Sequence, residues 1–223
     1  MDEIDILLVK ESIFKDNNQR AELLREELRK KKLTFVNVMS SPGSGKTSTL
    51  VSLIKEIGSR LNIAVMEADI DSDCDAKTIK NETQARCIQL HTGGMCHLDS
   101  EMTRQGLDKM GIEGIDLCFL ENIGNLVCPA EFDTGAHLNL VILSVPEGDD
   151  KPLKYPLMFS VSDIVVINKI DTLPIFDFNL KNCKESILKE NPNAKIFEIS
   201  AKKNIGIKEL ANYLIEEHKK LIQ

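Results

Sequence analysis

The chain has 223 residues, of which 42% are hydrophobic, and a formal net charge of −7 from 28 Lys and Arg against 35 Asp and Glu. This length allows one core of ordinary size, and the acidic balance excludes a general nucleic-acid-binding surface. The sequence has neither a secretory signal pattern nor an apolar stretch of the roughly 18 residues that a membrane span requires, so we expect a cytoplasmic protein.

The chain begins with a helical pattern that ends in the basic run at 29–32, whose cations complement the dipole at a helix C-terminus. We expect residues 1–33 to form an N-terminal helical extension ahead of a single domain, 34–223. Apolar runs typical of buried strands occur at 34–39, 63–68, 87–90, 115–121, 138–145, 163–169 and 195–200. Helical patterns lie between most of them, at 46–60, 75–84, 98–110, 151–160, 178–190 and 206–221. This alternation predicts an α/β fold, with a mostly parallel sheet covered by helices on both faces and ligands at the carboxyl ends of the strands.

A Gly-rich segment, SSPGSGKT, joins the first predicted strand to a helical pattern. It matches the phosphate-binding loop G-x-x-x-x-G-K-S/T except that Ser40 replaces the first Gly, which is tolerable where the backbone has ordinary φ and ψ. Lys46 would reach the β- and γ-phosphates, and the Thr47 hydroxyl would bind Mg²⁺. A fortuitous Gly-rich turn is disfavoured by the strand before it and the helix after it. Phosphate contacts are expected from Pro42, Gly43, Ser44, Gly45, Lys46, Thr47 and Ser48.

The sequence ENIG ends the fourth predicted strand, where many P-loop proteins have D-x-x-G. Glu121 would replace the Asp that holds Mg²⁺ through water, and the Gly124 N–H would meet the γ-phosphate. The motif alone is a weak signal, and its position in the chain order strengthens it.

An acidic stretch, EADIDSDCDAK, follows the second predicted strand. Carboxylates close to a triphosphate favour Mg²⁺ coordination in one of the nucleotide states. Asp69 ends the strand and Asp75 opens a helix, so these two are the better candidates. For Asp71 and Asp73 we prefer a solvated acidic loop. Catalytic contacts are expected from Lys46, Asp75, Glu121 and Gly124.

The sequence NKID follows the sixth predicted strand and indicates the base. The Asp171 carboxylate would accept from guanine N1–H and the exocyclic amine, neither of which adenine offers there. Asn168 would donate to N7, and the Lys169 stem would cover the base. The sequence SAK after the seventh strand would give guanine O6 a backbone donor, from the residues Ser200, Ala201 and Lys202. These motifs in this order predict a GTP-binding protein.

A P-loop kinase is the competing class, and such kinases usually close an arginine-bearing lid on the phosphates. This chain has no arginine after Arg104, which argues against a lid. The residue after Gly124 is Asn125 rather than the water-orienting Gln of fast GTPases. We therefore expect slow intrinsic hydrolysis.

Two cysteines and a histidine form a second candidate site. Cys96 and His97 are adjacent after a Gly pair, and Cys128 closes the segment that begins at Glu121. Two thiolates and an imidazole suit Zn²⁺ or Ni²⁺. Inert buried thiols are the alternative that spacing alone leaves open. The remaining thiols are expected to be reduced and incidental: Cys74, Cys87, Cys118 and Cys183.

The chain resembles the HypB family of hydrogenase maturation GTPases, which are nickel-incorporation factors. The stretches that carry the resemblance are FVNVMSSPGSGKTSTL, TGGMCHLDSEM, LENIGNLVCPAEFDTG, LSVPEGDDKPLKYPLMF and VVINKIDTLP. The resemblance implies a SIMIBI-type GTPase domain over 34–223 that dimerises with GTP, and a nickel or zinc site at Cys96, His97 and Cys128 between subunits. It also implies a HypA-type nickel carrier and the NiFe-hydrogenase large subunit as partners, and urease as a second client in some organisms.

The sequence departs from many relatives in two places. Residues 1–19 contain no His or Cys, so nickel storage at the N-terminus is not expected. Glu101 and Gln105 occupy positions where some relatives have additional histidines. Two further hypotheses stay open: a GTP-dependent docking module whose zinc is structural and which recruits a separate nickel carrier, and a urease-accessory GTPase.

Overall fold

The computed structural model describes residues 3–69 and 73–223, and the side chains from residue 15 onward. Asp71, expected in a solvated loop, lies outside the described residues. Within them the sheet has seven strands in the order β3-β2-β4-β1-β5-β6-β7, and every strand pair is parallel. The strands are β1 (Thr34–Ser40), β2 (Ile63–Asp69), β3 (Arg86–His91), β4 (Leu117–Glu121), β5 (Leu138–Ser144), β6 (Ile164–Asn168) and β7 (Lys195–Glu198). The expected parallel α/β sheet is confirmed.

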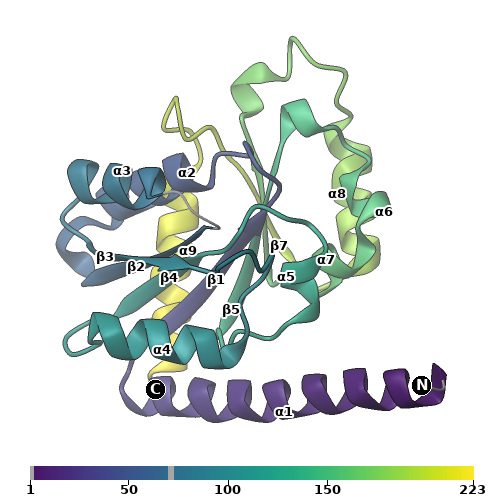
Figure 1. Ribbon diagram of the computed structural model, residues 1–223. Helices are drawn as coiled ribbons and strands as arrows, with labels where there is room; N and C mark the ends of the chain where they lie inside the picture. Colours follow the sequence, from purple (N-terminus) through teal and green to yellow (C-terminus); the bar gives the residue numbers. More distant parts are fainter. Residues whose placement is uncertain (1–2, 70–72) are drawn as a thin grey trace.

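Helices cover both faces of this sheet, as Figure 1 shows. One face packs against α2 (Lys46–Ile57), α3 (Cys74–Glu82) and α9 (Ile207–Leu221). The other packs against α1 (Glu3–Lys30) and α4 (Ser100–Met110) beside β2 and β4, and against α7 (Pro156–Ser160) and α8 (Leu180–Glu190) beside β5 and β6. The short helices are α5 (Cys128–Glu131), α6 (Lys151–Lys154), η1 (Gly58–Arg60), η2 (Val145–Glu147) and η3 (Ile170–Thr172).

Side chains that alternate along β1 contribute to the apolar layers on both faces of the sheet. Val36 and Val38 face the α2 side, whereas Phe35 faces α1 and α4. Successive side chains of a strand point to opposite faces, and a strand that is buried on both faces reads as a continuous apolar run.

The N-terminal helix α1 spans Glu3–Lys30, within the helical extension expected at 1–33. Leu24 and Leu28 lie on one face of α1 and are buried with Phe35 and Leu120 of the sheet. The N-terminal end of α1 projects beyond the domain (Figure 1). None of the helices in the described part of the chain is long and apolar enough to cross a membrane.

Local interactions explain two of the helix boundaries that differ from expectation. The predicted helix at 151–160 is divided into α6 and α7 because Pro156 lacks the N–H that would continue the first helix. The predicted helix at 98–110 begins at Ser100, since the Asp99 side chain accepts from Met102 N and caps it. The short helix α5 is not apparent in the sequence pattern.

Candidate nucleotide and metal site

The phosphate-binding loop lies between β1 and α2, at the carboxyl edge of the sheet. Gly43 and Gly45 have φ of +77° and +97°, which favour glycine, and α2 begins directly afterwards at Lys46. Ser40 is the last residue of β1 and has extended backbone, so no glycine is needed there. Its buried hydroxyl oxygen lies 3.0 Å from Lys46 Nζ and 2.6 Å from Ser44 Oγ. Ser40 therefore braces the loop that it opens.

Asn168 joins the NKID segment to the phosphate-binding loop. Its Nδ2 donates to the Ser44 carbonyl at 3.0 Å, and its Oδ1 accepts from Ala201 N at 3.3 Å. Lys169 reaches the Gly43 carbonyl with Nζ at 2.6 Å. A Cβ on Gly45 would lie 2.6 Å from Asn168 Nδ2, so the loop tolerates only glycine at this position.

A cavity of about 870 Å³ lies between these two segments. Two of its lining residues are paired: Ser200 Oγ donates to Asp171 Oδ1 at 2.6 Å, which orients the carboxylate expected to bind guanine. Pro42, Gly43, Ser44, Lys46, Glu121 and Gly124 are not part of the cavity lining. The predicted residues that line it are Gly45, Thr47, Ser48, Asp75, Asn168, Lys169, Asp171, Ser200, Ala201 and Lys202.

The ENIG segment contacts the phosphate-binding loop at two points. Thr47 Oγ1 donates to Glu121 Oε1 at 2.9 Å. A Cβ on Gly124 would lie 3.1 Å from Pro42, so glycine allows the two loops to touch. Between them Asn122, which the sequence reasoning missed, is fully buried and donates from Nδ2 to Asn37 Oδ1 at 3.0 Å. The segment is thus anchored at its start and closely packed against the loop at Gly124.

The structure groups three carboxylates beside Thr47, and one of them was not predicted. Glu67, Asp75 and Glu121 each offer an oxygen, and these oxygens lie within 4.8 Å of one another. Asp69, which was expected to bind Mg²⁺, is not in this group. Asp73, which was expected in a solvated loop, is exposed and forms an ion pair with Lys77 at 2.7 Å. The sequence signal for Glu67 is the single acidic residue inside the apolar run IAVMEA.

Burial dominates the electrostatics of this group. It raises the pKa of Glu67 to about 12, with Glu121 as the second cause, and it also raises the pKa of Glu121. Carboxylate oxygens are the donors that hard divalent cations prefer, and Thr47 adds a hydroxyl. The residues present therefore fit an Mg²⁺ ion bound with a nucleotide.

The second predicted site is partly assembled. Cys96 Sγ lies 2.9 Å from Cys128 Sγ, and His97 Nδ1 lies 3.9 Å from Cys96 Sγ. Within the described residues, however, the three ligand atoms of Cys96, His97 and Cys128 are not all within 4.8 Å of one another. The His97 ring stacks on Phe132 with ring centroids 3.7 Å apart, and burial lowers its pKa. A neutral imidazole and two thiols are a donor set suited to Zn²⁺ or Ni²⁺.

Asn125 holds the turn that leads to Cys128. Its Oδ1 accepts from Val127 N at 2.7 Å, and its Nδ2 lies 3.4 Å from Cys128 Sγ. From the sequence, Asn125 was considered only as a replacement for the water-orienting Gln of fast GTPases. In the structure it fixes the turn that presents Cys128. On α4, Glu101 and Gln105 are hydrogen-bonded to each other at 3.1 Å.

The fold and the loop between β1 and α2 define a P-loop nucleotide-binding protein, and the fold is that of the SIMIBI-type GTPases. The structure of the signal recognition particle 54 kDa protein from Aeropyrum pernix K1 in complex with GDP matches with a TM-score of 0.58 at 13% identity, over 85% of this chain and 50% of that one. This likeness concerns the fold alone. The model of the CobW/HypB/UreG nucleotide-binding domain matches residues 34–198, and the chain belongs to this family, on its HypB branch.

Curated relatives cover nearly the whole chain. The hydrogenase maturation factor HypB of Rhizobium leguminosarum bv. viciae is 43% identical over 91% of this chain and 67% of its own length. The hydrogenase/urease maturation factor HypB of Helicobacter pylori strain J99 is 38% identical over 98% of this chain and 90% of its own length. The crystal structure of HypB from Helicobacter pylori in complex with nickel has a TM-score of 0.86 at 38% identity, over 93% of this chain and 97% of that one.

Proposed function

We propose that this chain is a GTPase metallochaperone that binds and slowly hydrolyses GTP and helps to insert nickel into NiFe-hydrogenase. The observation that carries the proposal is the short segment 121–128. Its first residue, Glu121, accepts a hydrogen bond from Thr47 beside the phosphate-binding loop. Its last residue, Cys128, lies against Cys96. A movement of this segment at the γ-phosphate would therefore be transmitted along the backbone to Cys128, one of the proposed metal ligands.

The nucleotide chemistry follows from the cavity residues. Asp171, oriented by Ser200, accepts from guanine N1–H and the exocyclic amine, and Lys169 covers the base. Lys46 and the backbone N–H groups of the loop hold the phosphates. Mg²⁺ would neutralise phosphate charge, held by Thr47, Asp75 and Glu121.

Slow hydrolysis follows from the residues around the γ-phosphate segment. Asn125 is engaged with the turn that ends at Cys128, so it does not supply the water-orienting amide of a fast GTPase. No arginine follows Arg104 in the sequence, which leaves the cavity without an arginine finger from that part of the chain. Slow hydrolysis of GTP then returns the metal site to its GDP-bound state.

Nickel is the cargo in this proposal. Cys96, His97 and Cys128 offer soft donors, and a GTP-promoted homodimer would place two such sets together. A HypA-type carrier and the hydrogenase large subunit are the proposed donor and recipient. The nickel complex of the Helicobacter pylori relative and the maturation role in the names of the relatives support this proposal.

The test is Ni²⁺ and Zn²⁺ affinity per protomer with GDP and with a non-hydrolysable GTP analogue. The expected result is a shift of at least about tenfold between the two nucleotide states, which equals 1.4 kcal/mol. Cys128→Ala abolishes both binding and shift. Cys87→Ala is the matched control, because burial raises the pKa of that thiol to about 11 and it lies on β3, outside the site. Identical metal affinity in both states would overturn the coupling.

A docking module with structural zinc is the second candidate. The observation that favours it is the stacking of His97 on Phe132, because in the described residues the ligand atoms of Cys96, His97 and Cys128 are not all within 4.8 Å of one another. In that case Cys96→Ala lowers dimer stability but leaves nickel delivery intact when a carrier is supplied. Delivery assays with hydrogenase and with urease as recipients also identify the client.

A further inference from the structure

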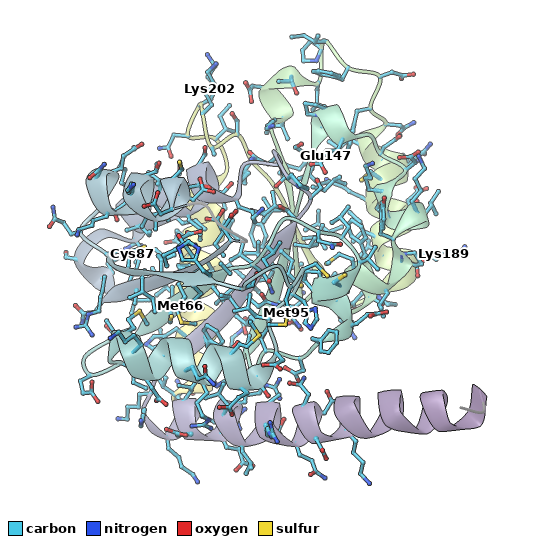
Figure 2. The ribbon with its side chains drawn as sticks, viewed as in Figure 1. Met66, Cys87, Met95, Glu147, Lys189 and Lys202 are labelled. Atoms are coloured by element: carbon cyan, nitrogen blue, oxygen red, sulfur yellow. The ribbon has the colours of Figure 1, made fainter. Side chains whose placement is uncertain are left out.

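Three polar side chains lie side by side on adjacent strands at the carboxyl edge of the sheet. Glu67 of β2 is the register partner of Gln89 in β3 and of Glu121 in β4. Figure 2 labels Met66 and Cys87 on opposite sides of the sheet, and they belong to the α4-side and α2-side cores respectively. Since neighbours along a strand alternate, Glu67 points to the α2 and α3 side, where Thr47 and Asp75 lie.

Glu67 is buried and incompletely paired. Glu67 and Glu121 are both 2% exposed. Among the described residues, neither Glu67 Oε1 nor Glu121 Oε2 has a hydrogen-bond partner. Two adjacent buried carboxylates with open oxygens are costly unless a cation or protons compensate them.

The three carboxylates lie together beside the nucleotide cavity. Asp75 lies on α3, lines the cavity and is exposed, so it approaches from the solvent side. Glu67 and Glu121 approach from the sheet, and the three ligand oxygens lie within 4.8 Å of one another. Three carboxylates and the Thr47 hydroxyl form a set of hard oxygen donors for a divalent cation.

We propose that Glu67 is an additional carboxylate of the nucleotide-linked divalent-cation site and faces the ion from the sheet beside Glu121. This assignment rests on the proposed nucleotide-binding function and adds a residue to it. When it is ionised beside a bound cation, Glu67 adds an oxygen donor and a negative charge, and this strengthens cation binding when the nucleotide is present. A purely structural role, in which Glu67 only fills space beside Glu121, makes the opposite prediction.

The test uses the full chain, with Mn²⁺ as the probe and GDP as the nucleotide. Free Mn²⁺ is measured by electron paramagnetic resonance, and GDP affinity is measured separately in EDTA with a fluorescent GDP analogue. Glu67→Gln keeps the volume and removes the charge, and is expected to weaken Mn²⁺ binding at least tenfold while GDP affinity in EDTA stays within twofold. Glu67→Asp, which keeps the charge on a shorter side chain, is expected to fall between Gln and wild type.

Asp73→Asn is the matched control, because this nearby carboxylate is paired with Lys77 and lies outside the group. It is expected to leave Mn²⁺ affinity within twofold of wild type. Wild-type Mn²⁺ affinity in Glu67→Gln would overturn the assignment, and so would a parallel loss of GDP binding in EDTA, which would place Glu67 in the fold of the nucleotide site. Failure of the wild type to bind GDP would instead refute the proposed function.

Discussion

Asn17 of α1 and Ser100 at the start of α4 are hydrogen-bonded to each other, although they are far apart in the sequence. Asn17 Oδ1 accepts from Ser100 N at 2.9 Å and from Ser100 Oγ at 2.8 Å. Asn17 Nδ2 donates in turn to the Asp133 carbonyl at 2.9 Å. Ser100 follows Cys96 closely, and Asp133 follows Cys128 closely, so one buried amide links the two arms that carry the thiols.

Replacing Asn17 with Ala is expected to weaken the metal site as well as the fold. The change leaves Ser100 N and the Asp133 carbonyl without their partner, which costs about 1–3 kcal/mol of unfolding free energy. Because both thiol arms lose a common anchor, Ni²⁺ affinity is expected to fall by about tenfold. Urea denaturation and Ni²⁺ titration of the same preparation check both effects.

Glu27→Gln is the control for the Asn17 experiment. Glu27 also joins α1 to α4, through Arg104 at 2.7 Å, and in the described part of the chain its other ion pair is with Lys31 rather than with the arm that follows Cys128. The pair is partly exposed, so its loss costs at most about 1 kcal/mol. An equal fall of Ni²⁺ affinity in Glu27→Gln would show that docking of α1 in general, and not Asn17, controls the site.

Gly45→Ala is expected to abolish tight nucleotide binding. The new Cβ would lie 2.6 Å from Asn168 Nδ2, and the backbone φ of +97° is unfavourable for Ala. The amide that joins the two nucleotide-binding segments must then move, so GDP affinity falls by at least about tenfold, or 1.4 kcal/mol.

Gly58→Ala, at the other end of α2, separates backbone strain from the Asn168 contact. Gly58 also has a positive φ, +56°, but a Cβ there meets nothing within 4 Å. We expect Gly58→Ala to lower the melting temperature without changing GDP affinity, as measured by fluorescence titration. Equal losses of affinity in the two variants would contradict the proposed role of the Gly45–Asn168 approach.

The strand-end motifs could be predicted because each is local. Gly45, Lys46 and Thr47 follow one strand directly, and Asn168 to Asp171 follow another, so the parallel sheet alone places them at one edge. Ser40 was acceptable as the first residue of the loop because it closes a strand, and this too is a local property.

Residues that act through tertiary pairing could not be predicted. Glu67 joins the carboxylate group because β2 pairs with β4 in a register that sets it beside Glu121, and no local pattern specifies that pairing. The role of Asn17 also depends on tertiary contacts, because its hydrogen-bond partners lie in α4 and in the chain after α5. The spacing of Cys96 and His97 likewise does not show that the His97 ring stacks on Phe132.

Asp171→Asn is expected to change which base is bound. The amide offers a donor where guanine presents donors, so GDP binding weakens by about 2–3 kcal/mol, roughly 30- to 150-fold. Xanthine carries a carbonyl at C2 in place of the amine, and xanthosine diphosphate should therefore gain affinity. Competition titrations with both nucleotides check this, and a variant that still prefers GDP would contradict the assignment of Asp171.

His137 makes the attachment of α1 dependent on pH. Its Nδ1 accepts from Phe35 N at 3.1 Å, and its Nε2 donates to the Arg25 carbonyl at 3.0 Å. The ring is therefore neutral in the folded state, and burial lowers its pKa to about 4 from the ordinary value of 6.5. The pKa lowering reports how strongly the fold prefers the neutral ring.

The sign of the pH effect follows from which state takes up the proton. Above pH 6.5 both states are neutral and the contribution of His137 to the unfolding free energy is complete. As the pH falls from 6.5 towards 4, the unfolded chain binds a proton that the folded chain does not, so stability is lost across this window. The unfolding free energies of wild type and His137→Gln are measured by urea denaturation at pH 7.5, 5.5 and 4.5. The wild-type value should fall steadily relative to that of His137→Gln as the pH falls. A difference that is independent of pH would mean that His137 titrates alike in both states.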